Sequence, residues 1–134
     1  MRVIVHVDGG SRGNPGPAAA AAVIRDEDGR LLDEAHATLG VTTNNVAEYR
    51  GLLLGLERAR AIGATEVRVL NDSELVAHQV NGRYKVKHPD LKPLHAQALR
   101  ALGDFRRATL EAVPRAQNAE ADALVNRALD AAAP

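Results

Sequence analysis

The alternation of apolar and polar positions in the first forty residues predicts three consecutive strands. Residues 3–7 form a short, β-branched apolar run bounded by turn-forming residues, which is typical of a buried strand. Residues 18–25 and 30–39 are two further extended runs, and the turn between them at 26–29 ends in Asp-Gly. An Asp-Gly turn between two extended runs predicts a β-hairpin.

The second of these runs contains a conflicting signal. The five consecutive alanines at 18–22 favour a helix by their intrinsic propensity. Pro17 before them and Val23-Ile24 after them are compatible with a strand. Small side chains would also let helices pack closely against this segment. We therefore expect a strand here, in conflict with local propensity.

The remaining residues alternate helical patterns with two more strands. Helices are predicted from about residue 45 to a stop at Gly63, from Ser73 to about Val80, after Pro89 through Phe105, and from Asn118 to Ala132, with strands at 67–71 and 109–113. Asn45 and Glu48 fit a loose capping box at the start of the first helix. The order β-β-β-α-β-α-α-β-α predicts an α/β fold in which helices cover the faces of a mixed sheet.

The composition narrows the classes of function. A chain of 134 residues suits one domain, which we expect to span residues 1–134. Seventeen acidic and seventeen basic side chains give zero formal net charge, so no global field attracts a polyanion. One phenylalanine, two tyrosines and no tryptophan argue against broad stacking on nucleic-acid bases.

The sequence contains no cysteine, which excludes disulfides, thiol nucleophiles and cysteine-ligated zinc. It also shows no apolar stretch of membrane-spanning length and no signal peptide. We therefore expect a soluble protein of the cytoplasm.

Asp8 and Asp72 occupy equivalent places in the pattern, because each follows a short apolar strand. Ligands bind at the carboxyl ends of strands in open α/β sheets, so two neighbouring parallel strands would bring both carboxylates together. Asp8 alone could instead cap the turn formed by the glycine-rich loop expected from residue 9 to 16. That loop lacks the Gly-Lys-Ser/Thr ending of a Walker phosphate loop.

Glu48 and Asp122 each add an acid to the apolar stripe of a predicted helix. Glu48 continues a stripe with Leu52, and Asp122 lies on a stripe that ends in Val125 and Leu129. Taken singly, Glu48 could complete a helix cap and Asp122 could be favoured by the helix dipole.

Taken together, Asp8, Glu48, Asp72 and Asp122 predict a divalent-metal site. Converging carboxylates repel one another and raise each other's pKa unless cations neutralise them. Carboxylate oxygens prefer hard ions, which favours Mg²⁺ or Mn²⁺ over zinc. Two such ions about 4 Å apart can activate water and stabilise a leaving oxygen in phosphodiester cleavage. The four acids are therefore candidate metal ligands and catalytic groups.

Four stretches stand out by their content and spacing: DGGSRGNPGPA at 8–18, TTNNVAEYRGLLLGL at 42–56, NDSELV at 71–76 and NAEADAL at 118–124. In combination they resemble type 1 ribonuclease H, and the resemblance covers nearly the whole chain. NGRYKVKHPDLKPL at 81–94 is similar to the compact subgroup that lacks the basic protrusion of larger members.

The resemblance implies a single ribonuclease H domain, with three antiparallel strands followed by parallel strands in a five-stranded mixed sheet flanked by helices. It implies endonucleolytic cleavage of the RNA strand of RNA–DNA hybrids, leaving 5′-phosphate and 3′-hydroxyl ends. Asp8 would contact both metal ions, Glu48 and Asp72 the ion on the leaving-group side, and Asp122 the ion that activates water. The compact subgroup also suggests cleavage of double-stranded RNA. We expect a monomer.

The resemblance also implies contacts with the nucleic acid, including backbone N–H groups of the glycine-rich loop. The residues at matching positions are Gly10, Ser11, Arg12, Gly13, Asn14, Thr43, Asn44, Asn45 and Arg115. Asn and Thr in turns are often local caps, and that alternative stays open for these side chains. Arg115 lies in a loop where many members carry a histidine, so we expect it to face a phosphate, and the resemblance does not extend to a histidine-dependent step.

Five basic side chains between residues 83 and 92 allow two interpretations, a solvated surface or a track for backbone phosphates. Two rival functions share parts of this pattern. An ATPase of the actin or sugar-kinase type needs two lobes, which 134 residues do not provide. A non-catalytic hybrid-binding module of the same fold is the alternative function, and the loss of one or more acids would be its expected signature.

Overall fold

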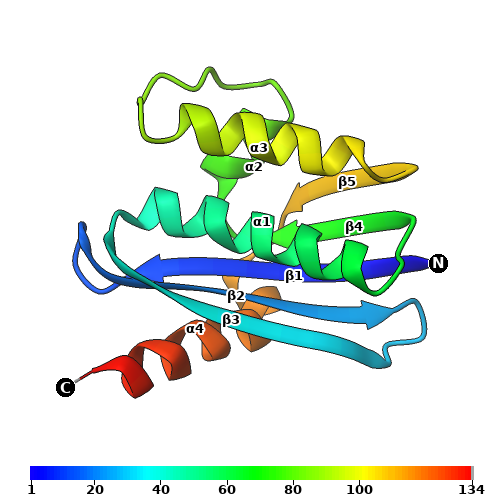
Figure 1. The fold of residues 1–134 in the computed structure, drawn as a ribbon, viewed down its shortest axis with the longest axis horizontal. Helices are drawn as coiled ribbons and strands as arrows, with labels where there is room; N and C mark the ends of the chain where they lie inside the picture. The colour runs from blue at the N-terminus through cyan, green and yellow to red at the C-terminus, as the bar shows by residue number, and fades with distance from the viewer. Residues whose placement is uncertain (134) are drawn as a thin grey trace.

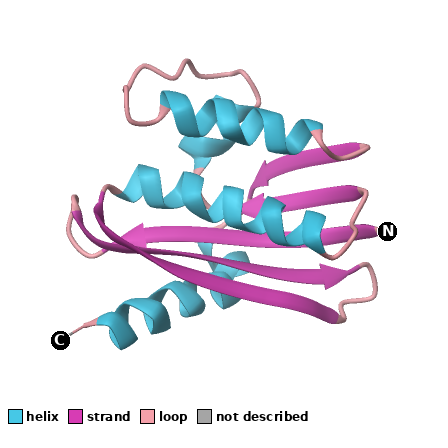
Figure 2. Cartoon of the chain, in the orientation of Figure 1, coloured by secondary structure: helices cyan, strands magenta, loops and turns pink. Residues whose placement is uncertain are grey.

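The computed structural model describes residues 1–133 and consists of one five-stranded sheet with helices on both faces (Figures 1 and 2). The elements are β1 (Arg2–Ser11), β2 (Gly16–Asp26), β3 (Leu31–Thr42), α1 (Asn44–Ala61), β4 (Glu66–Asn71), α2 (Glu74–Val80), α3 (Lys92–Gly103), β5 (Arg107–Ala112), the 3₁₀ helix η1 (Arg115–Asn118) and α4 (Ala119–Ala132). The predicted order of strands and helices is confirmed, with η1 as a short addition before the last helix.

The sheet has the strand order β3-β2-β1-β4-β5. β1 pairs antiparallel with β2, and β2 pairs antiparallel with β3. β4 lies parallel to both β1 and β5. The expected mixed sheet is therefore confirmed, and the carboxyl ends of β1 and β4 lie at the same edge, on the left of Figure 1.

The alanine-rich segment forms a strand, β2, as the flanking residues predicted, and this strand is buried on both faces. Ala19, Ala21 and Val23 pack with α4 in one core, whereas Ala22 and Ile24 belong to the core that includes α1. The alanines give each helix a close approach to the sheet, and burial between two helical layers outweighs their helical propensity.

α1 packs against β1 through a stripe of very small residues. Gly51 faces the backbone of Asp8 so closely that a Cβ added there would overlap the Asp8 carbonyl oxygen. At Gly55 a Cβ would lie 2.5 Å from a methyl carbon of Val7. The helix can therefore lie directly on the strand that carries Asp8, because these positions have no side chain.

The loop expected to begin at residue 9 begins later. β1 continues through Gly9, Gly10 and Ser11, which pair with β2 in antiparallel register. Within the glycine-rich segment, Gly13 adopts a positive φ of 87°, whereas Gly9 and Gly10 are extended. The sequence-based boundary was wrong because pairing with the long strand β2 extends the sheet past the apolar run.

The predicted capping box at the start of α1 is also wrong. Thr43 is the N-cap, and its hydroxyl accepts a hydrogen bond from the Val46 N–H at 3.3 Å. Asn45 lies within the helix, and the Glu48 carboxylate points to β1 instead of back to the cap.

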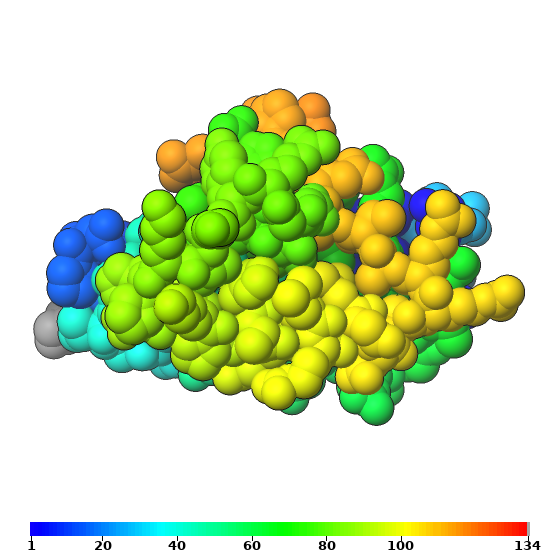
Figure 3. All heavy atoms as spheres, turned by 90° about the horizontal axis from the view of Figure 1, so that it is seen from above, coloured from blue at the N-terminus to red at the C-terminus, as the bar shows by residue number. Residues whose placement is uncertain are grey.

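α3 and the segment that leads into it cover the outer side of α1, as the view from above in Figure 3 shows. Leu94 and Ala98 bury one face of α3 in the core.

No helix within residues 1–133 is both long and apolar enough to cross a membrane.

Candidate active site

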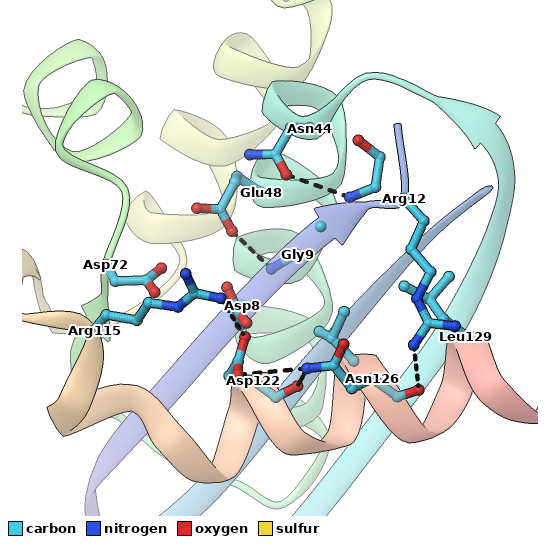
Figure 4. Close-up of a pocket in the computed structure, with 13 residues that line it drawn as sticks. Asp8, Gly9, Arg12, Asn44, Glu48, Asp72, Arg115, Asp122, Asn126 and Leu129 are labelled. Carbon is cyan, nitrogen blue, oxygen red and sulfur yellow. Dashed lines mark hydrogen bonds and ion pairs between the residues drawn. The ribbon is translucent and has the colours of Figure 1, made fainter. Parts of the chain in front are cut away.

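The edge where β1 and β4 run parallel brings three acids together. Asp8 lies near the end of β1, Asp72 follows β4 directly, and Glu48 lies in the second turn of α1. One carboxylate oxygen from each of the three lies within 4.8 Å of the other two. The predicted convergence of Asp8 with Asp72 and Glu48 is therefore observed (Figure 4).

Glu48 is held in place by the backbone of β1. Its Oε1 accepts a hydrogen bond of 2.7 Å from the Gly9 N–H. This contact depends on the close approach of α1, because a Cβ on Gly9 would overlap the backbone of Ala47. Because Gly9 has no side chain, α1 can approach β1 closely enough for the Gly9 N–H to orient Glu48.

Asp122 lines the same cavity from α4 but lies outside the group of three. Its Oδ1 lies 3.6 Å from the guanidinium of Arg115. The Asn126 side-chain amide donates to the Asp122 backbone carbonyl at 3.1 Å and lies 3.5 Å from its Oδ2. The structure therefore brings the fourth predicted acid to the site but engages it with groups of the chain itself.

Asn118 fixes the start of α4 against β1. Its side chain is buried, donates to the Val7 carbonyl oxygen at 2.8 Å and lies 3.2 Å from the His6 ring through its Oδ1. Because Asp122 follows one helical turn later, this anchor sets the position of Asp122 relative to Asp8.

The four acids line a cavity of about 380 Å³. Among the predicted substrate-binding residues, the cavity is lined by Gly10, Ser11, Arg12, Asn44 and Arg115, and not by Gly13, Asn14, Thr43 or Asn45. Val125, Asn126 and Leu129 of α4 complete the opposite wall.

Several of the predicted substrate contacts already have partners within the chain. Asn14 Oδ1 accepts from the Asn44 N–H at 3.0 Å, and Asn44 Oδ1 accepts from the Ser11 N–H at 3.3 Å. The Arg12 N–H donates to the Pro17 carbonyl at 2.8 Å, so the backbone donors at 11 and 12 are used within the fold. These bonds clamp the glycine-rich segment to the start of α1, and contact with a substrate stays a prediction for these residues.

Arg12 and Thr43 have structural roles of their own. The Arg12 guanidinium pairs with Asp130 at 2.7 Å and connects the glycine-rich segment to α4. The hydroxyl of Thr43 caps α1, which is the local role that the sequence left open.

Burial and mutual repulsion disfavour the ionised forms of Asp8 and Glu48. Burial, reinforced by the charge of Asp72, raises the pKa of Asp8 from 3.8 to about 7. Burial, reinforced by the charge of Asp8, raises the pKa of Glu48 from 4.5 to about 9. Without a cation, the cluster holds protons at pH values where isolated carboxyl groups are ionised.

This donor set fits a divalent cation. All three groups offer carboxylate oxygens, which hard ions such as Mg²⁺ and Mn²⁺ prefer. A bound cation also removes the repulsion that raises the pKa values of Asp8 and Glu48. Asp122 lies within the same cavity and can add a further oxygen.

The raised pKa values predict that the metal-free protein loses stability as the pH rises. The folded protein retains protons on Asp8 and Glu48 that the unfolded chain releases near pKa 3.8 and 4.5. That stabilisation is complete below the unfolded values and disappears as the pH rises through about 7 and about 9. In EDTA, the melting temperature should therefore fall from about pH 5 to about pH 9, whereas saturating Mg²⁺ should flatten the curve.

Thermal unfolding followed by circular dichroism across this pH range measures the effect. The double variant Asp8→Asn/Glu48→Gln lacks both titrations and serves as the control. If its melting temperature falls with pH as steeply as that of the wild-type protein, the cluster is not the cause.

The residues that position the acids were not predicted from the sequence. Gly51 and Gly55, together with Ala47, recur every four residues on the face of α1 that meets β1. That spacing of small residues is a signal of close helix packing that could have been found. Asn118 and Asn126 flank Asp122, but nothing in their spacing reveals the partners that they find.

Residues 6–128 match the family described as reverse transcriptase-like. The chain belongs to this family and is a domain of the ribonuclease H type.

Three relatives illustrate the similarity. The bifunctional protein Rv2228c of Mycobacterium tuberculosis is 54% identical over 134 residues, which are 99% of this chain and 37% of the relative. The solved N-terminal ribonuclease H domain of Rv2228c, fused to maltose-binding protein, matches with a TM-score of 0.94 at 53% identity, over 98% of this chain and 95% of that one. The present chain thus spans 37% of the length of this mycobacterial relative.

The other two relatives are solved ribonucleases. RNase H1 of the archaeon Halobacterium salinarum matches with a TM-score of 0.96 at 42% identity, over 98% of this chain and 100% of that one. LC11-RNase H1, isolated from compost, was solved with an RNA/DNA hybrid and matches with a TM-score of 0.92 at 44% identity, over 97% of this chain and 98% of that one. The expected ribonuclease H fold is confirmed by these matches.

Proposed function

We propose that this chain is a metal-dependent endoribonuclease that hydrolyses the RNA strand of RNA–DNA hybrids. The observation that carries the proposal is the cluster of Asp8, Glu48 and Asp72 on the wall of the cavity, with carboxylate oxygens within 4.8 Å of one another. Such a cluster destabilises the fold unless a cation offsets the repulsion, which favours a catalytic role over a structural one. The similarity to LC11-RNase H1, solved with an RNA/DNA hybrid, supports the substrate class.

In this proposal the residues of the site have two kinds of role, binding the cation and positioning the acids. Asp8, Glu48 and Asp72 would hold the cation, and Asp122 would add a ligand from the opposite wall. When bound, divalent cations lower the pKa of water and neutralise charge on the leaving oxygen. The Gly9 N–H keeps the Glu48 carboxylate oriented, and Asn118 keeps α4 docked, so that the acids face one another before substrate binds.

The finer features of the reaction belong to the same proposal. Oxygen-only ligands favour Mg²⁺ or Mn²⁺. Two such ions can act together in phosphodiester cleavage, and the resemblance to type 1 ribonuclease H implies products with 5′-phosphate and 3′-hydroxyl ends. The resemblance of residues 81–94 to the compact subgroup motivates a second substrate, double-stranded RNA. The monomeric state, the cytoplasmic location and the extent of the domain over residues 1–134 stay predictions.

The test uses one labelled RNA strand in three forms: paired with DNA, paired with RNA, and single-stranded. Each form is incubated with the protein in Mg²⁺, in Mn²⁺ and in EDTA. We expect metal-dependent cleavage of the RNA–DNA hybrid into products with 5′-phosphate ends. Cleavage of the RNA duplex under the same conditions would establish the second substrate.

Two outcomes would contradict the proposal. Binding of the hybrid with no cleavage in either metal would identify a non-catalytic hybrid-binding module. Cleavage of the single strand at the same rate as the hybrid, or cleavage that persists in EDTA, would indicate a different nuclease class.

A further inference from the structure

Arg115 lines the cavity and faces Asp122 across it. It is the first residue of η1, and its guanidinium lies 3.6 Å from Asp122 Oδ1. Figure 4 shows its side chain lying across the site between Asp72 and Asp122. The Arg115 side chain is 79% exposed, so little packing opposes its movement.

Asp122 differs from the other three acids in having a cationic partner. Asp8, Glu48 and Asp72 lie within 4.8 Å of one another, with no basic side chain in an ion pair with any of them within residues 1–133. Asp122 faces Arg115 through one oxygen and Asn126 through the other. The cavity therefore contains one cluster of acids without a basic partner and one acid paired with an exposed arginine.

We propose that Arg115 competes with a divalent cation for Asp122, a role that rests on the proposed function. Without nucleic acid, the guanidinium occupies the Asp122 side of the site, so the protein binds one divalent cation at Asp8, Glu48 and Asp72 and a second only weakly. A phosphate of the substrate attracts Arg115 and frees Asp122. The substrate itself thereby completes the metal site.

The chemistry of the pair makes such an exchange feasible. A guanidinium and a divalent cation repel each other, so both cannot share the Asp122 carboxylate at low energy. An exposed ion pair is weak, so the guanidinium can be displaced at small cost. Arginine also forms bidentate hydrogen bonds with phosphate, which gives Arg115 a competing partner when nucleic acid arrives.

The test measures Mn²⁺ binding to the protein without nucleic acid, by electron paramagnetic resonance of free Mn²⁺. The variant Arg115→Gln removes the competing charge and keeps a polar side chain. Arg127→Gln is the matched control, because Arg127 is an exposed arginine of α4 that does not line the cavity. Asp122→Asn identifies which binding event uses Asp122.

We expect the wild-type protein and Arg127→Gln to bind one Mn²⁺ per chain with a weak second event. In Arg115→Gln the second event should tighten about 3- to 10-fold, in line with the loss of one exposed ion pair and its repulsion. The double variant Arg115→Gln/Asp122→Asn should lose this gain. The first binding event should stay within about twofold in all variants that keep Asp8, Glu48 and Asp72.

Two outcomes would overturn the competition. One is identical binding of the second Mn²⁺ in Arg115→Gln and in the wild-type protein. The other is equal tightening in Arg127→Gln, which would show a general effect of net charge. The readout needs no cleavage, so a protein that shows the competition but no hydrolysis would refute the proposed function alone.

Discussion

Asp8→Asn should reduce the rate of RNA hydrolysis at least about 100-fold and, in the absence of metal, raise the melting temperature of the protein. Groups that only support metal ligands contribute about 10- to 100-fold, so the loss of a central ligand should exceed that range. Asparagine has nearly the volume of aspartate, so packing near the end of β1 is preserved. The variant therefore removes the charge of a proposed metal ligand without creating a cavity.

The gain in stability follows from the same charges. Burial and the neighbouring Asp72 raise the pKa of Asp8, which means that its ionised form destabilises the metal-free fold near neutral pH. A neutral Asn at this position relieves the repulsion toward Glu48 and Asp72. Opposite effects on activity and stability are typical of functional sites whose residues are not optimised for folding.

Hydrolysis of a labelled RNA–DNA hybrid in Mg²⁺ and thermal unfolding in EDTA measure the two effects. Asp28→Asn is the control, because Asp28 lies in the exposed turn between β2 and β3. It should leave both the rate and the melting temperature nearly unchanged. An Asp8→Asn variant that cleaves at the wild-type rate would refute the metal-ligand role, and one that unfolds at a lower temperature would refute the electrostatic argument.

Gly51→Ala should destabilise the protein by about 3 kcal/mol, at the upper end of the usual range for overpacked cores. The added Cβ would overlap the carbonyl oxygen of Asp8, which is backbone and cannot move without disturbing β1. α1 must therefore shift away from the sheet. The shift would also separate Glu48 from the Gly9 N–H, so cleavage at temperatures where the variant is folded should decline as well.

Gly103→Ala is a matched control, since Gly103 is also helical but has no atom within 4 Å of an added Cβ. There the substitution should change stability by less than about 1 kcal/mol, in the favourable direction. Urea unfolding of both variants gives the comparison. Equal stabilities would mean that the contact between α1 and β1 is looser than the structure indicates.

Local patterns predicted the order of strands and helices and the place of Asp8 and Asp72 after two of the strands, whereas the arrangement of the five strands was implied by the resemblance to ribonuclease H. Short apolar runs identify strands, and an acid at the end of each of two parallel neighbours lies at one edge of the sheet. The residues that orient the acids escaped prediction because their effect depends on docking. Gly51 is needed because a larger side chain would overlap the backbone of Asp8, and this contact exists only once α1 is packed on β1.

The same reason explains the other differences. The capping box failed because the helix begins two residues earlier, at the Thr43 cap, so Glu48 lies too far along α1 to reach back and bonds to the Gly9 N–H instead. The pairing of Asp122 with Arg115 depends on where α4 meets the sheet, which is set by Asn118 and the Val7 carbonyl. The alanines of β2 were placed correctly only because the flanking residues outweighed their own propensity.

The burial of β2 on both faces has a thermodynamic consequence for the whole molecule. Glu48 belongs to the helix on one face of the sheet, and Asp122 to the helix on the other. A ligand that engages both acids would connect the two cores across the sheet. Occupancy of the cavity would therefore slow amide hydrogen exchange in α1 and α4 together, even though the sheet separates them.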